Sequence, residues 1–186
     1  MQPSYKHYLK IIRNTCTGHE RPVTIPSEEL ADLARLAEEH CTVPFVLSSF
    51  RGTPFYSSML QRTRSMMLNY YQIDQFTRHT VSLLEDNGID CILLKGISLA
   101  SCYPVPEYRK LGDLDLYISR KSDVSKAQKL LESHGYVAEN ELSDHHLTYH
   151  YTFPKTGRRF LLELHYRVVG MYQYERANQI VDQVYS

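Results

Sequence analysis

The sequence contains no tryptophan, no net charge and no long apolar run. Its four cysteines lack the Cys-x-x-Cys spacing of a zinc or redox site. Lys and Arg total 21, as do Asp and Glu, so no overall positive field would hold a long nucleic acid. No apolar run approaches the roughly 18 residues that span a bilayer, and the N-terminus lacks the apolar core of a secretory signal. We therefore expect no long nucleic acid and no membrane as partner, and unpaired cysteines predict a reducing, cytoplasmic setting.

The pattern of apolar residues divides the chain into an all-helical part and a mixed part. Apolar residues between Leu30 and Cys41 keep helical spacing, and neither Gly nor Pro interrupts residues 56–87. Short apolar runs separated by turn residues begin at Ile89. These patterns predict an α+β protein in three parts. The parts are a helical N-terminal part that packs on the core, 1–87; the core, 88–170; and a C-terminal helix without a capping signal, whose natural domain we expect to continue, 171–186.

A strand-to-helix turn opens the core. The run Cys91 to Leu94 is wholly apolar, which predicts a buried strand, and Lys95-Gly96 leads into small and apolar residues that predict a helix. Glycine at such a turn lets a phosphate approach the backbone N–H groups of the helix start, and Lys95 and Ser98 would add a charge and a hydroxyl. The turn therefore predicts a phosphate site, although glycine at such turns is also common for steric reasons.

Two carboxylates follow, on Asp113 and Asp115, in a run that otherwise alternates toward apolar residues. On a β-strand this spacing sends both side chains to one face. Like charges aimed at one point are costly without a cation, and hard oxygen ligands suit Mg²⁺ or Mn²⁺. The alternative is a solvated strand face or an Asp turn, because a lone Asp-x-Asp often occurs by chance.

A predicted hairpin supplies a third carboxylate. Two strand-like segments, 147–153 and 159–166, are joined by the turn-rich residues 154–157. Glu163 lies between two leucines in the second segment. It is a candidate metal ligand, and the alternative is a surface residue paired with a neighbouring arginine.

A second set of residues, one aspartate and four histidines, is an alternative to the carboxylates as a metal site and would suit Zn²⁺ or another transition metal. We call it the rival set. Only one pair of its histidines has helical i, i+4 spacing, and the surrounding residues look like strand and turn, which favours a solvated loop. A histidine-based zinc protein stays open as an alternative. The rival set comprises Asp144, His145, His146, His150 and His165.

Taken together, these residues resemble the nucleotidyltransferase superfamily typified by DNA polymerase β. That superfamily has a glycine turn opening a helix, an Asp-x-Asp pair on the next strand, and a third carboxylate on a later strand. More closely, residues 56–170 look like the bacterial uncharacterised nucleotidyltransferase family. The motifs that carry this likeness are Leu94-Lys95-Gly96, Arg109, Gly112-Asp113-Leu114-Asp115-Leu116, His145-His146 and Leu162-Glu163-Leu164-His165.

The resemblance implies a mixed β-sheet core flanked by helices, and transfer of a nucleoside monophosphate, preferably AMP, from a nucleoside triphosphate to a hydroxyl. The acceptor would be a small molecule or a protein. An inactive binding module on the same fold is the alternative. Two features depart from the superfamily pattern, because Ile97 follows Gly96 and the third carboxylate is a Glu.

The resemblance also implies three groups of site residues. Mg²⁺ or Mn²⁺ would be held by Asp113, Asp115 and Glu163, with Glu163 as general base. The triphosphate would be contacted by Lys95, Gly96, Ser98 and Arg109. The acceptor pocket would be lined by His145, His146 and His165.

Overall fold

The computed structural model describes residues 3–18, 23–139 and 143–184. They fall into two compact units, which we describe separately. The first unit comprises residues 1–72 and 99–111, and the second comprises 73–98 and 112–186. This division differs from the domains expected from the sequence, whose boundaries after residues 87 and 170 stay a prediction.

The first unit is helical. The helix α2 carries its apolar residues at helical spacing, and Leu33 and Ala37 are fully buried. They pack with Tyr8, Phe50 and Met59 in one hydrophobic core. The elements of this unit, with α4 and α5, which each have residues in both units, are α1 (Pro3–Thr17), η1 (Ser27–Glu29), α2 (Leu30–Glu39), α3 (Val43–Val46), η2 (Leu47–Phe50), α4 (Tyr56–Glu85), α5 (Ile97–Ala100) and η3 (Pro106–Tyr108).

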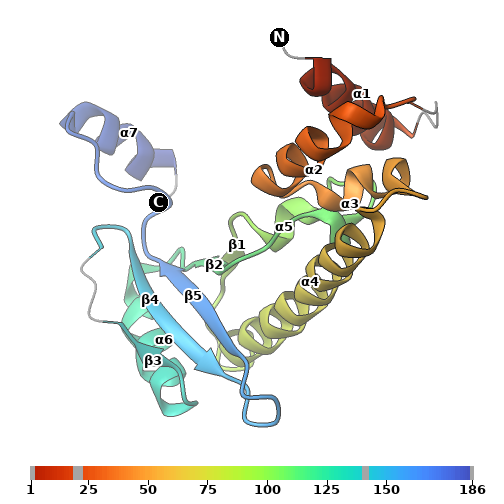
Figure 1. Cartoon of the computed structure of the whole chain (residues 1–186). Helices are drawn as coiled ribbons and strands as arrows, with labels where there is room; N and C mark the ends of the chain where they lie inside the picture. The colour runs from red at the N-terminus through yellow and green to blue at the C-terminus, as the bar shows by residue number, and fades with distance from the viewer. Residues whose placement is uncertain (1–2, 19–22, 140–142, 185–186) are drawn as a thin grey trace. The chain divides into compact units, whose positions relative to one another are not determined.

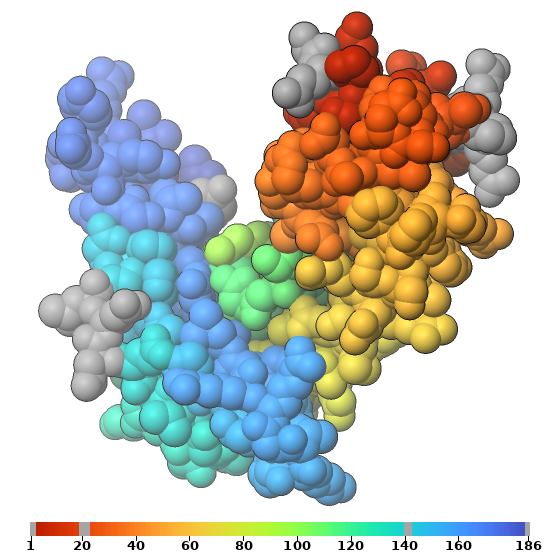
Figure 2. All heavy atoms as spheres, in the orientation of Figure 1, coloured from red at the N-terminus to blue at the C-terminus, as the bar shows by residue number. Residues whose placement is uncertain are grey.

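The second unit contains a five-stranded mixed sheet in the order β1-β2-β5-β4-β3. Strands β2 and β5 are parallel, and the other neighbours are antiparallel. The α+β class and the hairpin predicted from the sequence are confirmed. Figure 1 shows β4 and β5 side by side, and Figure 2 draws the heavy atoms in the same orientation. The elements are β1 (Ile92–Leu93), β2 (Leu114–Tyr117), α6 (Lys121–Ser133), β3 (Val137–Ala138), β4 (His146–Thr152), β5 (Arg159–His165) and α7 (Glu175–Val184).

The two faces of β5 have different surroundings. Phe160, Leu162 and Leu164 point to one face and are buried, and the Phe76 ring of α4 lies 5.0 Å from the Phe160 ring. Successive side chains of a strand alternate between faces, so Glu163 shares the opposite face with the residues two positions away. The sheet thus uses one face for packing against α4 and leaves the other for polar side chains.

The expected burial of the first strand is wrong. β1 lies at an edge of the sheet, paired only with β2 in that order, and Ile92 is 53% exposed. A wholly apolar run does not distinguish a central strand from an edge strand. The helix expected after Gly96 forms, but α5 spans only four residues.

A buried hydrogen bond joins α4 to the start of β3. The Thr80 hydroxyl donates to the Phe76 carbonyl oxygen at 2.9 Å, so it accepts from the Tyr136 hydroxyl at 2.8 Å. We expect Thr80→Val to cost about 1–3 kcal/mol of unfolding free energy, because the buried Tyr136 hydroxyl loses its acceptor. Urea denaturation measures it. The double variant with Tyr136→Phe should recover part of this loss, and a purely additive double variant would contradict the prediction.

Cys91 precedes β1, and burial is the main reason that the pKa of its thiol is raised to about 11, with smaller contributions from the charges of Glu85 and Asp90. The thiolate is the reactive form, and an ordinary thiol has a pKa of about 8.5, so near neutral pH we expect alkylation to be slower by about two orders of magnitude. Peptide mass spectrometry after timed iodoacetamide labelling measures the rate. The exposed Cys16 and Cys102 serve as controls, and equal labelling of all three would contradict the prediction.

The C-terminal helix α7 is tied to the end of β5 by one buried arginine. The Arg167 guanidinium donates to the carbonyl oxygens of Val169 and Gly170, both at 2.7 Å, and to Asp182 of α7 at 3.0 Å. It also contacts the Asn178 side chain at 3.3 Å. These contacts hold α7 and the segment before it in one position relative to the sheet.

Within the described residues, no helix combines the length and apolarity that a membrane crossing requires.

Candidate active site

The parallel pairing of β2 and β5 brings the predicted carboxylates together. Asp115 lies directly opposite Glu163 in the register, so both point to the face that is not packed against α4. Asp115 is 1% exposed, whereas the side chains of Glu163 and Asp113 are partly exposed. Asp113 precedes β2 by one residue. The three carboxylates therefore meet on one side of the sheet.

The ammonium group of Lys95 lies near all three carboxylates. Its ammonium Nζ lies 3.0 Å from Asp115 Oδ1, 3.8 Å from Glu163 Oε2 and 3.9 Å from Asp113 Oδ2. The sequence analysis expected Lys95 to contact phosphate, and that role stays a prediction. In the structure its charge compensates the carboxylates, and because the side chain is 54% exposed it is free to exchange this contact for another anion.

The pKa values of the Asp115 and Glu163 carboxyl groups are shifted in opposite directions. Burial alone raises the pKa of Asp115, but hydrogen bonds from His165 and Lys95 outweigh it and hold that pKa below the usual range. Burial also raises the pKa of Glu163, and the neighbouring Asp115 carboxylate raises it further. Burial lowers the pKa of Lys95, but its bond to Asp115 reverses the shift. The site therefore keeps a charged aspartate beside a glutamate that holds its proton more firmly than usual.

The backbone conformation at position 96 favours glycine. Its φ is +58°, a conformation that residues with a side chain rarely adopt, and a Cβ there would lie 3.5 Å from the Asp113 carbonyl oxygen. The Ser98 hydroxyl lies 3.1 Å from the Lys95 carbonyl oxygen, so it stabilises the same turn. The turn holds Lys95 against the carboxylates, and the phosphate contacts expected of Gly96 and Ser98 stay predictions.

Arg109 belongs to the first unit, at the end of η3. Its guanidinium donates to the Tyr103 hydroxyl at 3.2 Å and lies 5.6 Å from the centre of that ring. Its expected contact with the triphosphate stays a prediction.

The sequence analysis expected His165 to line an acceptor pocket. In the structure its ring lies directly beside the carboxylates. Its Nε2 lies 3.3 Å from both Asp115 Oδ1 and Glu163 Oε2, and its Nδ1 lies 3.3 Å from the Arg167 carbonyl oxygen. The signal in the sequence was its position two residues after Glu163, which places both side chains on one face of a strand.

These residues fit a divalent cation. Ligand atoms of Asp115, Glu163 and His165 lie within 4.8 Å of one another. Asp115 Oδ2 is buried and has no hydrogen-bond partner among the described residues, which is costly for a carboxylate oxygen unless a cation approaches it. Carboxylate oxygens are the ligands that Mg²⁺ and Mn²⁺ prefer.

The other histidines of the rival set separate into two places. His145 and His146 lie beside His165, and ring nitrogens of the three lie within 4.8 Å of one another. Burial and the charges of the neighbouring His145 and His165 lower the pKa of His146. His150 pairs instead with Glu139, because it lies four residues further along β4 rather than one turn along a helix. The five-residue set is thus not one site.

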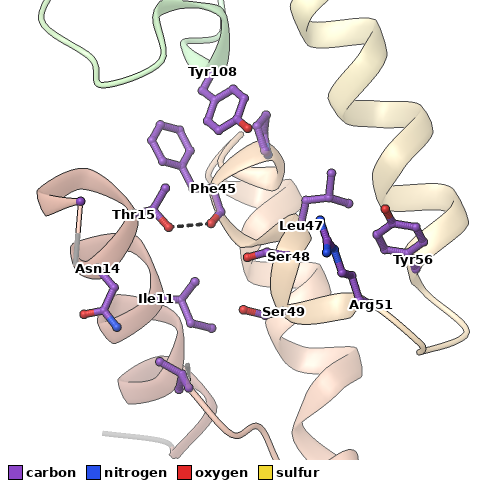
Figure 3. Close-up of a pocket in the computed structure, with 13 residues that line it drawn as sticks. Ile11, Asn14, Thr15, Phe45, Leu47, Ser48, Ser49, Arg51, Tyr56 and Tyr108 are labelled. Atoms are coloured by element: carbon purple, nitrogen blue, oxygen red, sulfur yellow. Dashed lines mark hydrogen bonds between the residues drawn. The ribbon is translucent and has the colours of Figure 1, made fainter. Parts of the chain in front are cut away.

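The first unit has a cavity of about 850 Å³ (Figure 3). Its walls come from α1, α3, η2, η3 and the start of α4, and the Thr15 hydroxyl donates to the Phe45 carbonyl oxygen at its edge. Nothing in the sequence analysis pointed to this cavity. Labelled residues around it in Figure 3 are Ile11, Asn14, Thr15, Phe45, Leu47, Ser48, Ser49, Arg51, Tyr56 and Tyr108.

Comparison with protein-family models gives a match over most of the chain. The model of a family described as uncharacterised nucleotidyltransferase matches residues 26–184, a longer stretch than the residues 56–170 whose motifs carried the resemblance. A search of the curated proteins finds no match. The family match confirms the resemblance drawn from these motifs.

Proposed function

The chain belongs to the uncharacterised nucleotidyltransferase family, and from this premise we propose that it transfers a nucleoside monophosphate from a nucleoside triphosphate to a hydroxyl of a small molecule or protein. The observation that carries the proposal is the convergence of Asp113, Asp115 and Glu163 on one point, with a buried Asp115 oxygen that has no partner among the described residues. The preferred nucleotide that we propose, AMP, rests on the resemblance alone.

Each carboxylate has a role in this proposal. Asp113, Asp115 and Glu163 would hold Mg²⁺ or Mn²⁺, which when bound would stabilise charge on the attacking and leaving oxygens. The acceptor oxygen forms a bond to the α-phosphorus, the bond from that phosphorus to the bridging oxygen breaks, and pyrophosphate leaves. Glu163 would take the proton of the acceptor hydroxyl.

Cationic and imidazole side chains would complete the site. Lys95 would leave the carboxylates and neutralise the charge of the phosphates, for which its exposed side chain has the freedom. We propose that Gly96, Ser98 and Arg109 also contact the triphosphate. His145, His146 and His165 would lie beside the acceptor hydroxyl.

Nucleotide binding tests the proposal first. Calorimetry with each nucleoside triphosphate, with and without Mg²⁺ or Mn²⁺, should find one that binds only with metal. The variant Asp113→Asn/Asp115→Asn should lose this binding, whereas Asp74→Asn on the surface of α4 should keep it. If no triphosphate binds at millimolar concentration, the proposal is wrong.

A second candidate is a binding module without turnover, and the position of Lys95 favours it. An ammonium group 3.0 Å from Asp115 already compensates the carboxylates without a metal ion. Such a module would bind a nucleotide with equal affinity in the presence of Mg²⁺ and of a chelator. Metal-dependent release of pyrophosphate would decide for the enzyme.

A further inference from the structure

Three histidines lie together beside the carboxylates. His146 on β4 is the register partner of His165 on β5, and His145 immediately precedes β4. The ring centres of His145 and His146 are 4.3 Å apart, and those of His146 and His165 are 5.1 Å apart. We propose that His145, His146 and His165 bind one transition-metal cation of the Zn²⁺ class. This site does not depend on the proposed nucleotide transfer.

The orientation of His145 supports a ligand role. Its Nδ1 lies 2.7 Å from Asp144 Oδ1, and Asp144 Oδ2 accepts the Met171 backbone N–H at 2.8 Å. A carboxylate that accepts the Nδ1 proton leaves the lone pair on Nε2. This is the carboxylate-histidine arrangement that commonly supports a metal ligand.

Gly170 leaves room for this arrangement. A Cβ at this position would lie 3.2 Å from Asp144 Oδ1 and 3.4 Å from His145 Nδ1. The Asp144 oxygen would have to shift by a few tenths of an ångström, which would disturb its hydrogen bond with His145. The chain therefore has a residue without a side chain where one would disturb the carboxylate-histidine pair.

The other two rings are also held through Nδ1. His165 Nδ1 lies 3.3 Å from the Arg167 carbonyl oxygen, which accepts only if that nitrogen carries the proton. His146 Nδ1 lies 3.2 Å from the Ser143 hydroxyl. His165 Nε2 also lies 3.3 Å from Asp115 and Glu163, so an ion would have to displace this contact with the carboxylates. One nitrogen of each of the three rings lies within 4.8 Å of the others, a set of the kind that binds zinc through three protein ligands with an open position.

The histidine site and the carboxylate site differ in the cation they favour. Imidazole nitrogens suit Zn²⁺ and Co²⁺, whereas Mg²⁺ is bound by oxygen. His165 lies next to both, since its Nε2 is 3.3 Å from Asp115 and Glu163. We assign His165 to the transition-metal site, with Mg²⁺ held by the carboxylates alone.

Cobalt titration of the full chain tests the site, because the visible spectrum of Co²⁺ reports its ligands. We expect one Co²⁺ per chain, displaced by Zn²⁺. His146→Gln should weaken binding by about 100-fold or more, since it removes one of three ligands. Asp144→Asn should weaken it by about 10–100-fold, since it removes the negative charge and one of the two acceptor oxygens that support His145. His150→Gln is the matched control on the same strand, and its affinity should stay within about twofold of the wild type.

The outcomes separate this site from the proposed function. Absence of Co²⁺ binding, or binding that His146→Gln and Asp144→Asn leave unchanged, would overturn the site. Loss of Co²⁺ binding in Asp113→Asn but not in the histidine variants would place the ion on the carboxylates and overturn the site as well. Binding of Mg²⁺ with nucleotide, measured on the same samples, tests the proposed function independently. Circular dichroism checks folding, and Asp144→Asn keeps the test valid if His146→Gln unfolds.

Discussion

Replacing Asp115 with asparagine is expected to lower nucleotide transfer by about 10³-fold or more, equivalent to about 4 kcal/mol of transition-state stabilisation. Asp115 is buried, and its Oδ2 has no partner among the described residues. An amide of the same shape carries no charge and directs two N–H donors where we propose that a cation binds. Pyrophosphate release measures the loss.

The control for this variant is Asp74→Asn, a carboxylate on the surface of α4 that pairs with Arg78. It should keep full activity. If Asp115→Asn retains more than about a tenth of the wild-type rate while its fold is intact, the aspartate does not hold a catalytic cation, and the binding-module reading is favoured.

Replacing Lys95 with methionine is expected to have opposite effects on metal binding and on transfer. Without nucleotide, the affinity for Mn²⁺ should rise by about tenfold, or about 1.4 kcal/mol, because the ammonium no longer competes for the carboxylates. The rise is modest because the Lys95 side chain is 54% exposed and the ion pair is screened by solvent. Transfer should fall by about 10²-fold, because the charge proposed for the phosphates is lost. Calorimetry and pyrophosphate release measure the two effects.

Lys129→Met on α6 provides a comparison that removes one positive charge at a position outside the carboxylate cluster. Its metal affinity should match the wild type. Unchanged or weaker Mn²⁺ binding in Lys95→Met would show that the lysine does not compete with a cation. Unchanged transfer would exclude Lys95 from the reaction.

The local pattern of the sequence predicted those elements that depend on local signals. The absence of Gly and Pro from residues 56–87 predicted α4, and the turn at 154–157 predicted the β4–β5 hairpin. The edge position of β1 was not predicted, because which strands pair is decided by tertiary contacts rather than by apolar residues in one segment. The exposed Ile92 is the result.

The sequence predicted which residues belong to the candidate site better than it predicted the contacts among them. Asp115 and Glu163 are distant in the sequence, and only the parallel pairing of β2 and β5 makes them neighbours. The resemblance implied a metal site shared by the three carboxylates, but the pairing itself could not be read from either strand. The contact of Lys95 with the carboxylates was missed because its sequence neighbours, Gly96 and Ser98, suggested a phosphate instead.

The anchoring of α7 by Arg167 has a practical consequence for anyone who shortens the protein. The same arginine binds Asp182 of α7 and the carbonyl of Gly170, and the next residue, Met171, supplies the N–H that holds Asp144 against His145. Trimming the chain before α7 would remove one end of this connection and loosen the support of His145, which is distant from the cut in the sequence. Metal assays therefore need the chain through residue 184, even though α7 itself provides none of the proposed ligands.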